Sequence, residues 1–175
     1  IQQGSFAPWP TSNYNLPQNV YPLNGQLPIA WVFSLWGNVK LTGLIQYITM
    51  PLGFLGVFGL SRCLGAAKWQ SFFAALLFLG LPEVIILSST ALTDLLVANL
   101  VAVITFMLLK GMRDKQKNHL FLSALCMGII LGIKQTVFFL IPGFALLLLI
   151  LWLLDKKQNL KPLLFWVLST IISFV

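Results

Sequence analysis

The chain has 175 residues, of which 58% are hydrophobic and only 9% are charged, whereas water-soluble domains carry about 25% charged residues. A soluble domain of this length buries only about two thirds of its unfolded surface, which is too little to hide so many apolar side chains. The composition therefore predicts an integral membrane protein. The net charge of +7 comes from basic residues that flank apolar segments and form no groove-sized patch, which argues against nucleic-acid binding.

Residues 1–27 carry no charge and contain four prolines and four asparagines. Proline restricts the backbone and removes hydrogen-bond donors, so this segment is predicted to be an irregular loop. Its amide and aromatic side chains offer neutral hydrogen bonds and flat stacking surfaces, which suit sugars. The candidate substrate-binding residues of this loop are Trp9, Asn13, Gln18, Tyr21 and Gln26. An ordinary connecting loop is the alternative interpretation.

Residues 28–37 form an apolar stretch that is too short to span a bilayer. Trp31 and Trp36 are typical of a helix that lies at the membrane interface. Residues 38–175 are predicted to form an all-α, polytopic transmembrane bundle of about six spans, with the last one truncated.

The first span is predicted over residues 41–60, because a helix needs roughly 20 apolar residues to cross the hydrocarbon core. Pro51 is expected to kink this helix. Gly53, Gly56 and Gly59 leave room for a neighbouring helix to approach closely.

The apolar stretch 69–109 would be about 60 Å long as one helix, twice the roughly 30 Å of the hydrocarbon core. We expect it to reverse at Ser88-Ser89-Thr90, where hydroxyl groups satisfy backbone groups left open by a turn. The stretch 120–154 is expected to reverse in the same way at residues 134–136. Gly128 and Gly132 form a small-xxx-small helix-packing pair before that turn.

The basic residues sort to the two ends of this arrangement. Nine fall on one side: Arg62, Lys68, Lys110, Arg113, Lys115, Lys117, Lys156, Lys157 and Lys161. Lys40 and Lys134 fall on the other side. An excess of lysine and arginine marks the cytoplasmic face, so residues 1–38 and the turns at 88–93 and 134–136 are predicted to be extracytoplasmic.

Four acidic residues complete the charge pattern. Asp114 and Asp155 lie among cytoplasmic lysines and are interpreted as solvated loop charges. Glu83 and Asp94 lie near the outer ends of two spans, where ionisable groups usually face a cavity or a partner. Lys134 is expected at the same level, so two carboxylates and one ammonium group are predicted to gather there. Helix capping or simple ion pairing is the alternative role.

No catalytic motif of a hydrolase, a nucleotide-binding protein or a zinc enzyme is present. Cys63 and Cys126 form neither a disulfide framework nor a metal-binding cluster, so no metal site is predicted. The chain begins without methionine and stops within an apolar run, so we expect it to be a fragment.

A set of short motifs follows in order along the chain: Tyr21-Pro22-Leu23, Pro28-Ile29, Trp31, Leu35-Trp36-Gly37, Ser61-Arg62, Leu81-Pro82, Thr93-Asp94, and Gly128 through Gly132-Ile133 to Lys134. In this order the set resembles bacterial polytopic membrane glycosyltransferases of the GT-C type, close to the protein-mannosyltransferase-like family 39. The likeness covers nearly the whole chain. Leu23 is a departure, because relatives often carry another proline there.

The resemblance implies transfer of a sugar from a polyprenyl-phosphate carrier to a glycan, lipid or protein acceptor outside the bacterial inner membrane. It places the catalytic base, an aspartate of the first external loop, before Ile1, so no residue here is assigned as catalytic. It leaves a divalent metal cofactor open. Glu83, Asp94 and Lys134 would bind or orient substrates, with Lys134 or Lys40 on the carrier phosphate.

Two other functions remain open from the sequence. A secondary transporter would use the same charged residues as a coupling path, with helix breaks at Pro51, Pro82 and Pro142. A scaffold or flippase-like subunit would leave the sugar-suited loop without a role.

Overall fold

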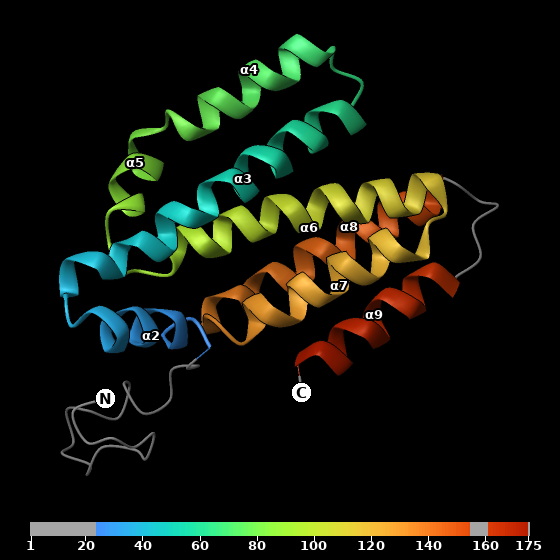
Figure 1. Cartoon of the computed structure of the whole chain (residues 1–175). Coiled ribbons are helices and arrows are strands. Elements are labelled where there is room, and N and C mark those ends of the chain that lie inside the picture. The colour runs from blue at the N-terminus through green and yellow to red at the C-terminus, as the bar shows by residue number, and fades with distance from the viewer. Residues whose placement is uncertain (1–23, 155–160, 175) are drawn as a thin grey trace.

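A computed structural model describes residues 24–154 and 161–174. This part of the chain contains eight α-helices, two 3-10 helices and no strand (Figure 1). The elements are α2 (Leu27–Trp36), η1 (Val39–Gly43), α3 (Leu44–Cys63), α4 (Lys68–Leu79), α5 (Pro82–Ser88), α6 (Asp94–Asp114), α7 (Lys117–Leu131), η2 (Gln135–Leu140), α8 (Ile141–Leu154) and α9 (Lys161–Phe174). The all-α fold predicted from the sequence is confirmed.

Within the described residues, three helical segments are long and apolar enough to cross a membrane, namely Lys40–Cys63, Asp94–Asp114 and Gln135–Leu153. This is consistent with an integral membrane protein. Helices α4 and α5 add a fourth span if they are counted together, although they are bent by 58° relative to each other. The bend has a local cause: a proline disfavours helical geometry in the residue before it, and Leu81, before Pro82, is extended with φ −61° and ψ 130°.

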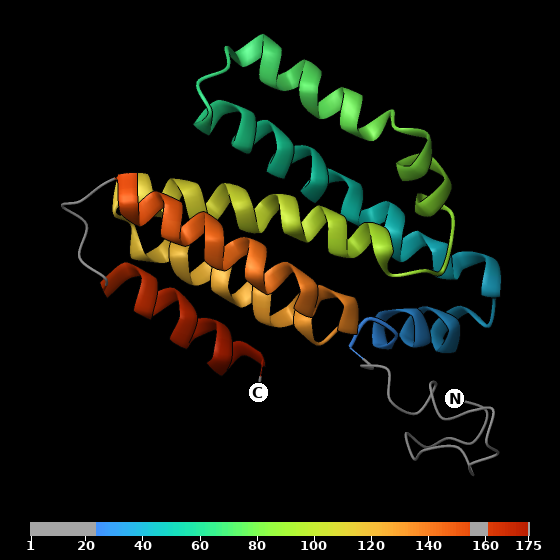
Figure 2. The same cartoon turned by 180° about the vertical axis from the view of Figure 1, so that it is seen from behind.

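Helices α4, α3, α6, α7 and α9 are neighbours in this order, and each packs against the next. Helix α8 covers one side of α6 and α7, as the reverse view shows (Figure 2). Its Phe144 and Leu148 are buried in a core that also includes Ile104 of α6 and Met127 of α7. Trp166 of α9 belongs to the same core, which therefore joins four helices.

The reversal expected at residues 88–90 is confirmed, because α5 ends at Ser88 and α6 begins at Asp94. The hydroxyls of Ser88, Ser89 and Thr90 each donate to the carbonyl oxygen three residues earlier, at 2.7, 2.9 and 2.9 Å. They satisfy the open carbonyl groups at the end of α5, as the sequence predicts. The reversal expected at 134–136 is also confirmed, between the end of α7 and the start of η2.

Close packing of α3 on α6 depends on the three glycines of α3, which are all buried. A Cβ atom added to Gly56 would lie 2.8 Å from the backbone nitrogen of Val103, and one added to Gly59 would lie 2.7 Å from the ring of Phe106. Gly53 meets the side chain of Asn99. The close approach predicted from these glycines is confirmed, and α3 continues through Pro51.

Seven of the nine described lysine and arginine residues lie at the helix ends on one side of the bundle, which we call the basic end (Figure 1). They are Arg62, Lys68, Lys110, Arg113, Lys115, Lys117 and Lys161. Lys40 and Lys134 lie at the opposite end. Lys156 and Lys157 lie outside the described residues.

Candidate functional site

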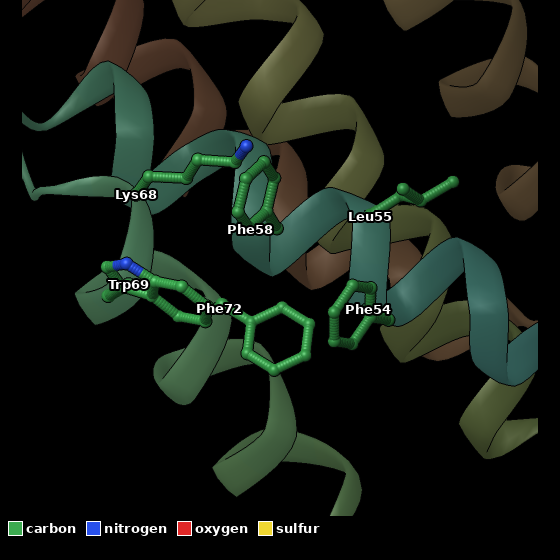
Figure 3. Close-up of a pocket in the computed structure, with 6 residues that line it drawn as sticks. All are labelled: Phe54, Leu55, Phe58, Lys68, Trp69 and Phe72. Atoms are coloured by element: carbon green, nitrogen blue, oxygen red, sulfur yellow. The ribbon is translucent and has the colours of Figure 1, made fainter.

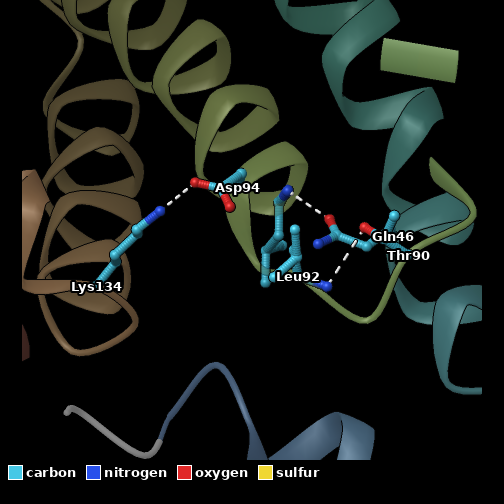
Figure 4. A network of polar contacts seen from close by, with 6 residues as sticks. Gln46, Thr90, Leu92, Asp94 and Lys134 are labelled. Atoms are coloured by element: carbon cyan, nitrogen blue, oxygen red, sulfur yellow. Dashed lines mark hydrogen bonds and ion pairs between the residues drawn. The ribbon is translucent and has the colours of Figure 1, made fainter. Parts of the chain in front are cut away.

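Asp94 and Lys134 form an ion pair at the end of the bundle opposite to the basic end (Figure 4). Asp94 is the first residue of α6, and Lys134 directly precedes η2. Their side chains are 39% and 31% exposed, so both charges remain within reach of solvent or of a ligand. The structure thus brings together two of the charged residues that the sequence places at one level.

The first described residues of the chain pack against the two residues that precede this ion pair in the sequence. Gly25 is buried, and a Cβ atom added to it would lie 2.8 Å from Cγ2 of Thr93 and 2.7 Å from Cγ2 of Ile133. These two residues directly precede the paired aspartate and lysine. A Cβ atom added to Gly132 would in turn clash with the side chain of Asn24. The segment therefore reaches the bundle at the two turns that carry the charges.

Helix α6 receives its N-terminal cap from another helix. Thr93 occupies the capping position but makes no side-chain capping bond. Instead, Oε1 of Gln46, from α3, accepts a hydrogen bond of 2.8 Å from the backbone N–H of Leu96 (Figure 4). The first N–H groups of a helix have no partner within the helix, so Gln46 satisfies one of them. It thereby holds the start of α6, and with it Asp94, against α3.

A buried polar ladder continues from Gln46 into the α3–α6 interface. The hydroxyl of Thr49 donates to the carbonyl oxygen of Gln46 at 2.7 Å, and Nδ2 of Asn99 donates to Oγ1 of Thr49 at 2.9 Å. Oδ1 of Asn99 is buried without a conventional hydrogen-bond partner. A Cβ atom added to Gly53 would clash with this oxygen, so the ladder requires glycine at position 53.

Glu83 does not join the ion pair. It lies exposed in the first turn of α5, and its side chain has no hydrogen bond or ion pair with any described residue. Five residues of helix, about 7.5 Å, separate it from Ser88, where the chain turns towards α6. The expectation that both carboxylates would gather around Lys134 is therefore correct for Asp94 alone.

The predicted residues of the N-terminal loop are mostly outside the described part of the chain, which begins at residue 24. These are Trp9, Asn13, Gln18 and Tyr21. Gln26 is exposed at the start of α2, where its carbonyl oxygen accepts a 2.8 Å bond from the N–H of Ala30 and its side chain makes no capping bond. Within the described residues, no group of three or more His, Cys, Asp or Glu side chains is placed to hold a metal ion.

Sequence reasoning missed Gln46, Thr49 and Asn99 as members of the site's support. A signal was available, because amide side chains are rare within apolar membrane segments. The spacing of three between Gln46 and Thr49 also places them on one helical face. What the sequence does not contain is their partner, since each contact with α6 joins residues 50 positions apart.

Comparisons with known proteins add no relative to this picture. No protein-family model, no curated protein and no solved structure matches the chain.

Proposed function

We propose that this chain is part of a membrane glycosyltransferase that moves a sugar from a polyprenyl-phosphate carrier to an acceptor outside the bacterial inner membrane. The observation that carries the proposal is the partly exposed Asp94–Lys134 ion pair, whose preceding residues Thr93 and Ile133 pack against Gly25. It places a cation at one end of a membrane bundle, close to residue 25, which follows in the sequence a stretch rich in neutral amide and aromatic side chains. The ordered motifs shared with GT-C enzymes support the same function.

The distribution of basic residues supports an orientation in which the ion pair lies on the extracytoplasmic side of the membrane. Seven described basic residues lie at the basic end, and Lys40 and Lys134 lie at the other. Cytoplasmic loops of membrane proteins carry the excess of lysine and arginine. On this rule the ion pair faces the extracytoplasmic side, where polyprenyl-linked sugars are used by the enzymes that the chain resembles.

Lys134 fits the role of a phosphate-binding residue. An ammonium group has three N–H donors, and the contact with Asp94 occupies one of them, which leaves two for phosphate oxygens. In the reaction, the acceptor oxygen forms a bond to the anomeric carbon, and the bond from that carbon to the phosphate oxygen breaks. The electron pair stays on the departing polyprenyl phosphate, whose charge Lys134 stabilises.

Asp94 acts in this proposal as a positioning residue that holds the lysine side chain in place. Lys40, exposed at the same end, is a second cation for the carrier, and Glu83 is available to orient the acceptor. The proton of the acceptor goes to a base that we assign to none of the described residues. Gln26 and the loop residues before it are proposed to bind the sugar through amide and aromatic contacts.

One observation favours a secondary transporter as the second candidate. The 58° bend between α4 and α5 is a discontinuous helix of the kind that forms binding sites in transporters. Transporter sites lie near the middle of the membrane, however, whereas the ion pair lies where α6 begins. We therefore rank transport below sugar transfer.

The test measures sugar transfer by the full-length protein in membrane vesicles with a panel of polyprenyl-phosphate sugars. We expect Lys134→Ala to lower transfer by about 10-fold to 100-fold, the equivalent of one hydrogen bond to a charged group. Asp94→Asn should lower it less, because the lysine remains. Both variants should insert into the membrane normally.

Matched controls remove the same charges at the basic end, with Lys117→Ala and Asp114→Asn, and should leave transfer unchanged. Full activity of both Asp94→Asn and Lys134→Ala would remove the ion pair from the site. Uptake of a solute into sealed vesicles, without transfer from any lipid-linked sugar, would favour the transporter instead.

A further inference from the structure

Helices α3 and α4 enclose a groove of about 220 Å³ near the basic end, which we call the α3–α4 groove (Figure 3). Its lining residues are Phe54, Leu55 and Phe58 from α3, and Lys68, Trp69 and Phe72 from α4. The groove is remote in the chain from the Asp94–Lys134 ion pair and has no part in the proposed sugar transfer.

The wall of the groove is a connected set of aromatic rings. The rings of Phe54 and Phe58 are stacked with centroids 6.4 Å apart, and Phe72 meets Phe54 edge-on at 5.6 Å. Trp69 continues the set with an edge contact to Phe72 at 6.2 Å. Leu55 and Phe72 are 58% and 42% exposed, so the groove opens to the outside of the bundle, where lipid chains lie.

Lys68 supplies a charge at the mouth of this apolar groove. It is the first residue of α4, is exposed, and has no hydrogen bond or ion pair with its side chain among the described residues. The guanidinium groups of Arg62 and Arg113 instead donate to backbone carbonyl oxygens, at 2.6 and 3.5 Å. The only carboxylate in the described part of the basic end is Asp114, on α6.

We propose that the α3–α4 groove binds one anionic phospholipid, with an acyl chain along the aromatic wall and the phosphate on Lys68. Basic pockets between membrane helices recognise anionic headgroups in this way. The N-terminus of α4 adds its positive dipole end at the same place. A volume of about 220 Å³ is below the roughly 300–1,000 Å³ of small-molecule sites, and therefore suits part of a single chain.

A zwitterionic phospholipid fills the groove with the same chain, but its headgroup carries a positive charge that cancels the attraction to Lys68. The proposal therefore concerns selectivity, and it holds whether or not the protein transfers sugars. Trp69, 81% exposed at the rim, is a natural reporter, since bromine atoms on a lipid chain quench tryptophan fluorescence on contact.

The experiment reconstitutes the full-length protein in bilayers that contain brominated phosphatidylglycerol or brominated phosphatidylcholine. The difference in quenching between the wild type and Trp69→Phe isolates the signal of Trp69 from the other tryptophans. We expect about fivefold preferential quenching by phosphatidylglycerol, the contribution of one lysine near an anionic surface. Lys68→Gln should abolish the preference, and Lys68→Arg should keep it.

Lys117→Gln is the matched control, because it removes an exposed lysine at the same end of the bundle but outside the groove. It should leave the preference unchanged. Equal quenching of Trp69 by both lipids in the wild type would overturn the proposal, as would an unchanged preference in Lys68→Gln. Loss of the preference on addition of water-soluble glycerol phosphate would show a phosphate site without a lipid groove, and would overturn it as well.

Discussion

The two faces of α6 are packed in different ways. Towards α3, the contact consists of buried glycines and a ladder of amide and hydroxyl side chains, so the two backbones nearly touch. Towards α7 and α8, it consists mainly of large apolar side chains, and a cavity of about 300 Å³ remains between α7, α8 and α9. Its lining includes Met127, Phe144 and Trp166.

This difference follows from the solvent. In lipid, apolar side chains gain little by leaving the bilayer for a protein interior, so helix association depends on close packing and interhelical hydrogen bonds. The α3–α6 interface has both. Helix α8 makes no side-chain hydrogen bond to another helix among its described residues, and most of its large side chains stay exposed to lipid. The first interface therefore positions Asp94 rigidly, whereas α8 is held mainly by Phe144 and Leu148.

The largest expected effect comes from replacing Gly56 by leucine. The new side chain would meet the backbone of Ala102 and Val103 at about 2.8–2.9 Å, and backbone cannot move aside without separating the helices. We expect a loss of about 1–3 kcal/mol in the free energy of unfolding, measured by denaturation of the purified protein in mixed micelles.

Gly143→Leu is the control for this substitution, because nothing lies within 4 Å of a Cβ atom at Gly143 in α8. It should change stability by no more than about 0.5 kcal/mol. Equal destabilisation by both substitutions would mean that the two faces of α6 do not differ in the way described.

A smaller effect is expected from Gln46→Leu, which leaves the N–H of Leu96 without its acceptor. A buried donor without a partner costs about 1–3 kcal/mol, and we expect the lower part of this range because Leu96 is only half-buried. Gln70→Leu is the matched control: Oε1 of Gln70 accepts from the N–H of Ala67 at an exposed position, where water replaces it. If Gln70→Leu lowered the free energy of unfolding as much as Gln46→Leu, burial would not explain the effect at Gln46.

The helical segments and their reversals were predictable because polar breaks are conspicuous in long apolar stretches. Ser88-Ser89-Thr90 and residues 134–136 interrupt runs too long for one span, and the chain turns at both places. Gly53 and Gly56 likewise predicted a closely packed neighbouring helix, since small residues repeated on one membrane helix mark helix–helix interfaces. These features are local, and local spacing is enough to find them.

Features that depend on distant residues were not predictable to the same extent. The pairing of Asp94 with Lys134 followed from topology alone, but the capping of α6 by Gln46 required knowing which face of α3 meets α6. The sequence does not indicate which side of α8 packs against the bundle, because a helix of uniformly apolar residues has no distinguishable face. Glu83 makes no ion pair with Lys134, and the 58° bend between α4 and α5 lies within a stretch expected to form one span.

The smallest expected effect on stability concerns two buried hydrogen bonds within the apolar core that α6, α7 and α9 share. Nε1 of Trp166 donates to Oγ of Ser123 at 3.1 Å, and that hydroxyl donates to the carbonyl oxygen of Ile104 at 3.0 Å. A double-mutant cycle of Trp166→Phe and Ser123→Ala, measured by unfolding in micelles, should give a coupling of about 0.6 kcal/mol, the average for such bonds in membranes. A coupling above about 2 kcal/mol would contradict this expectation, because polar contacts would then hold α9 to α7 as strongly as they hold α3 to α6.

Since the ring of Trp166 also fills the core beside Phe144, Trp166→Leu should lower the free energy of unfolding more than Trp166→Phe, which separates packing from hydrogen bonding at this position.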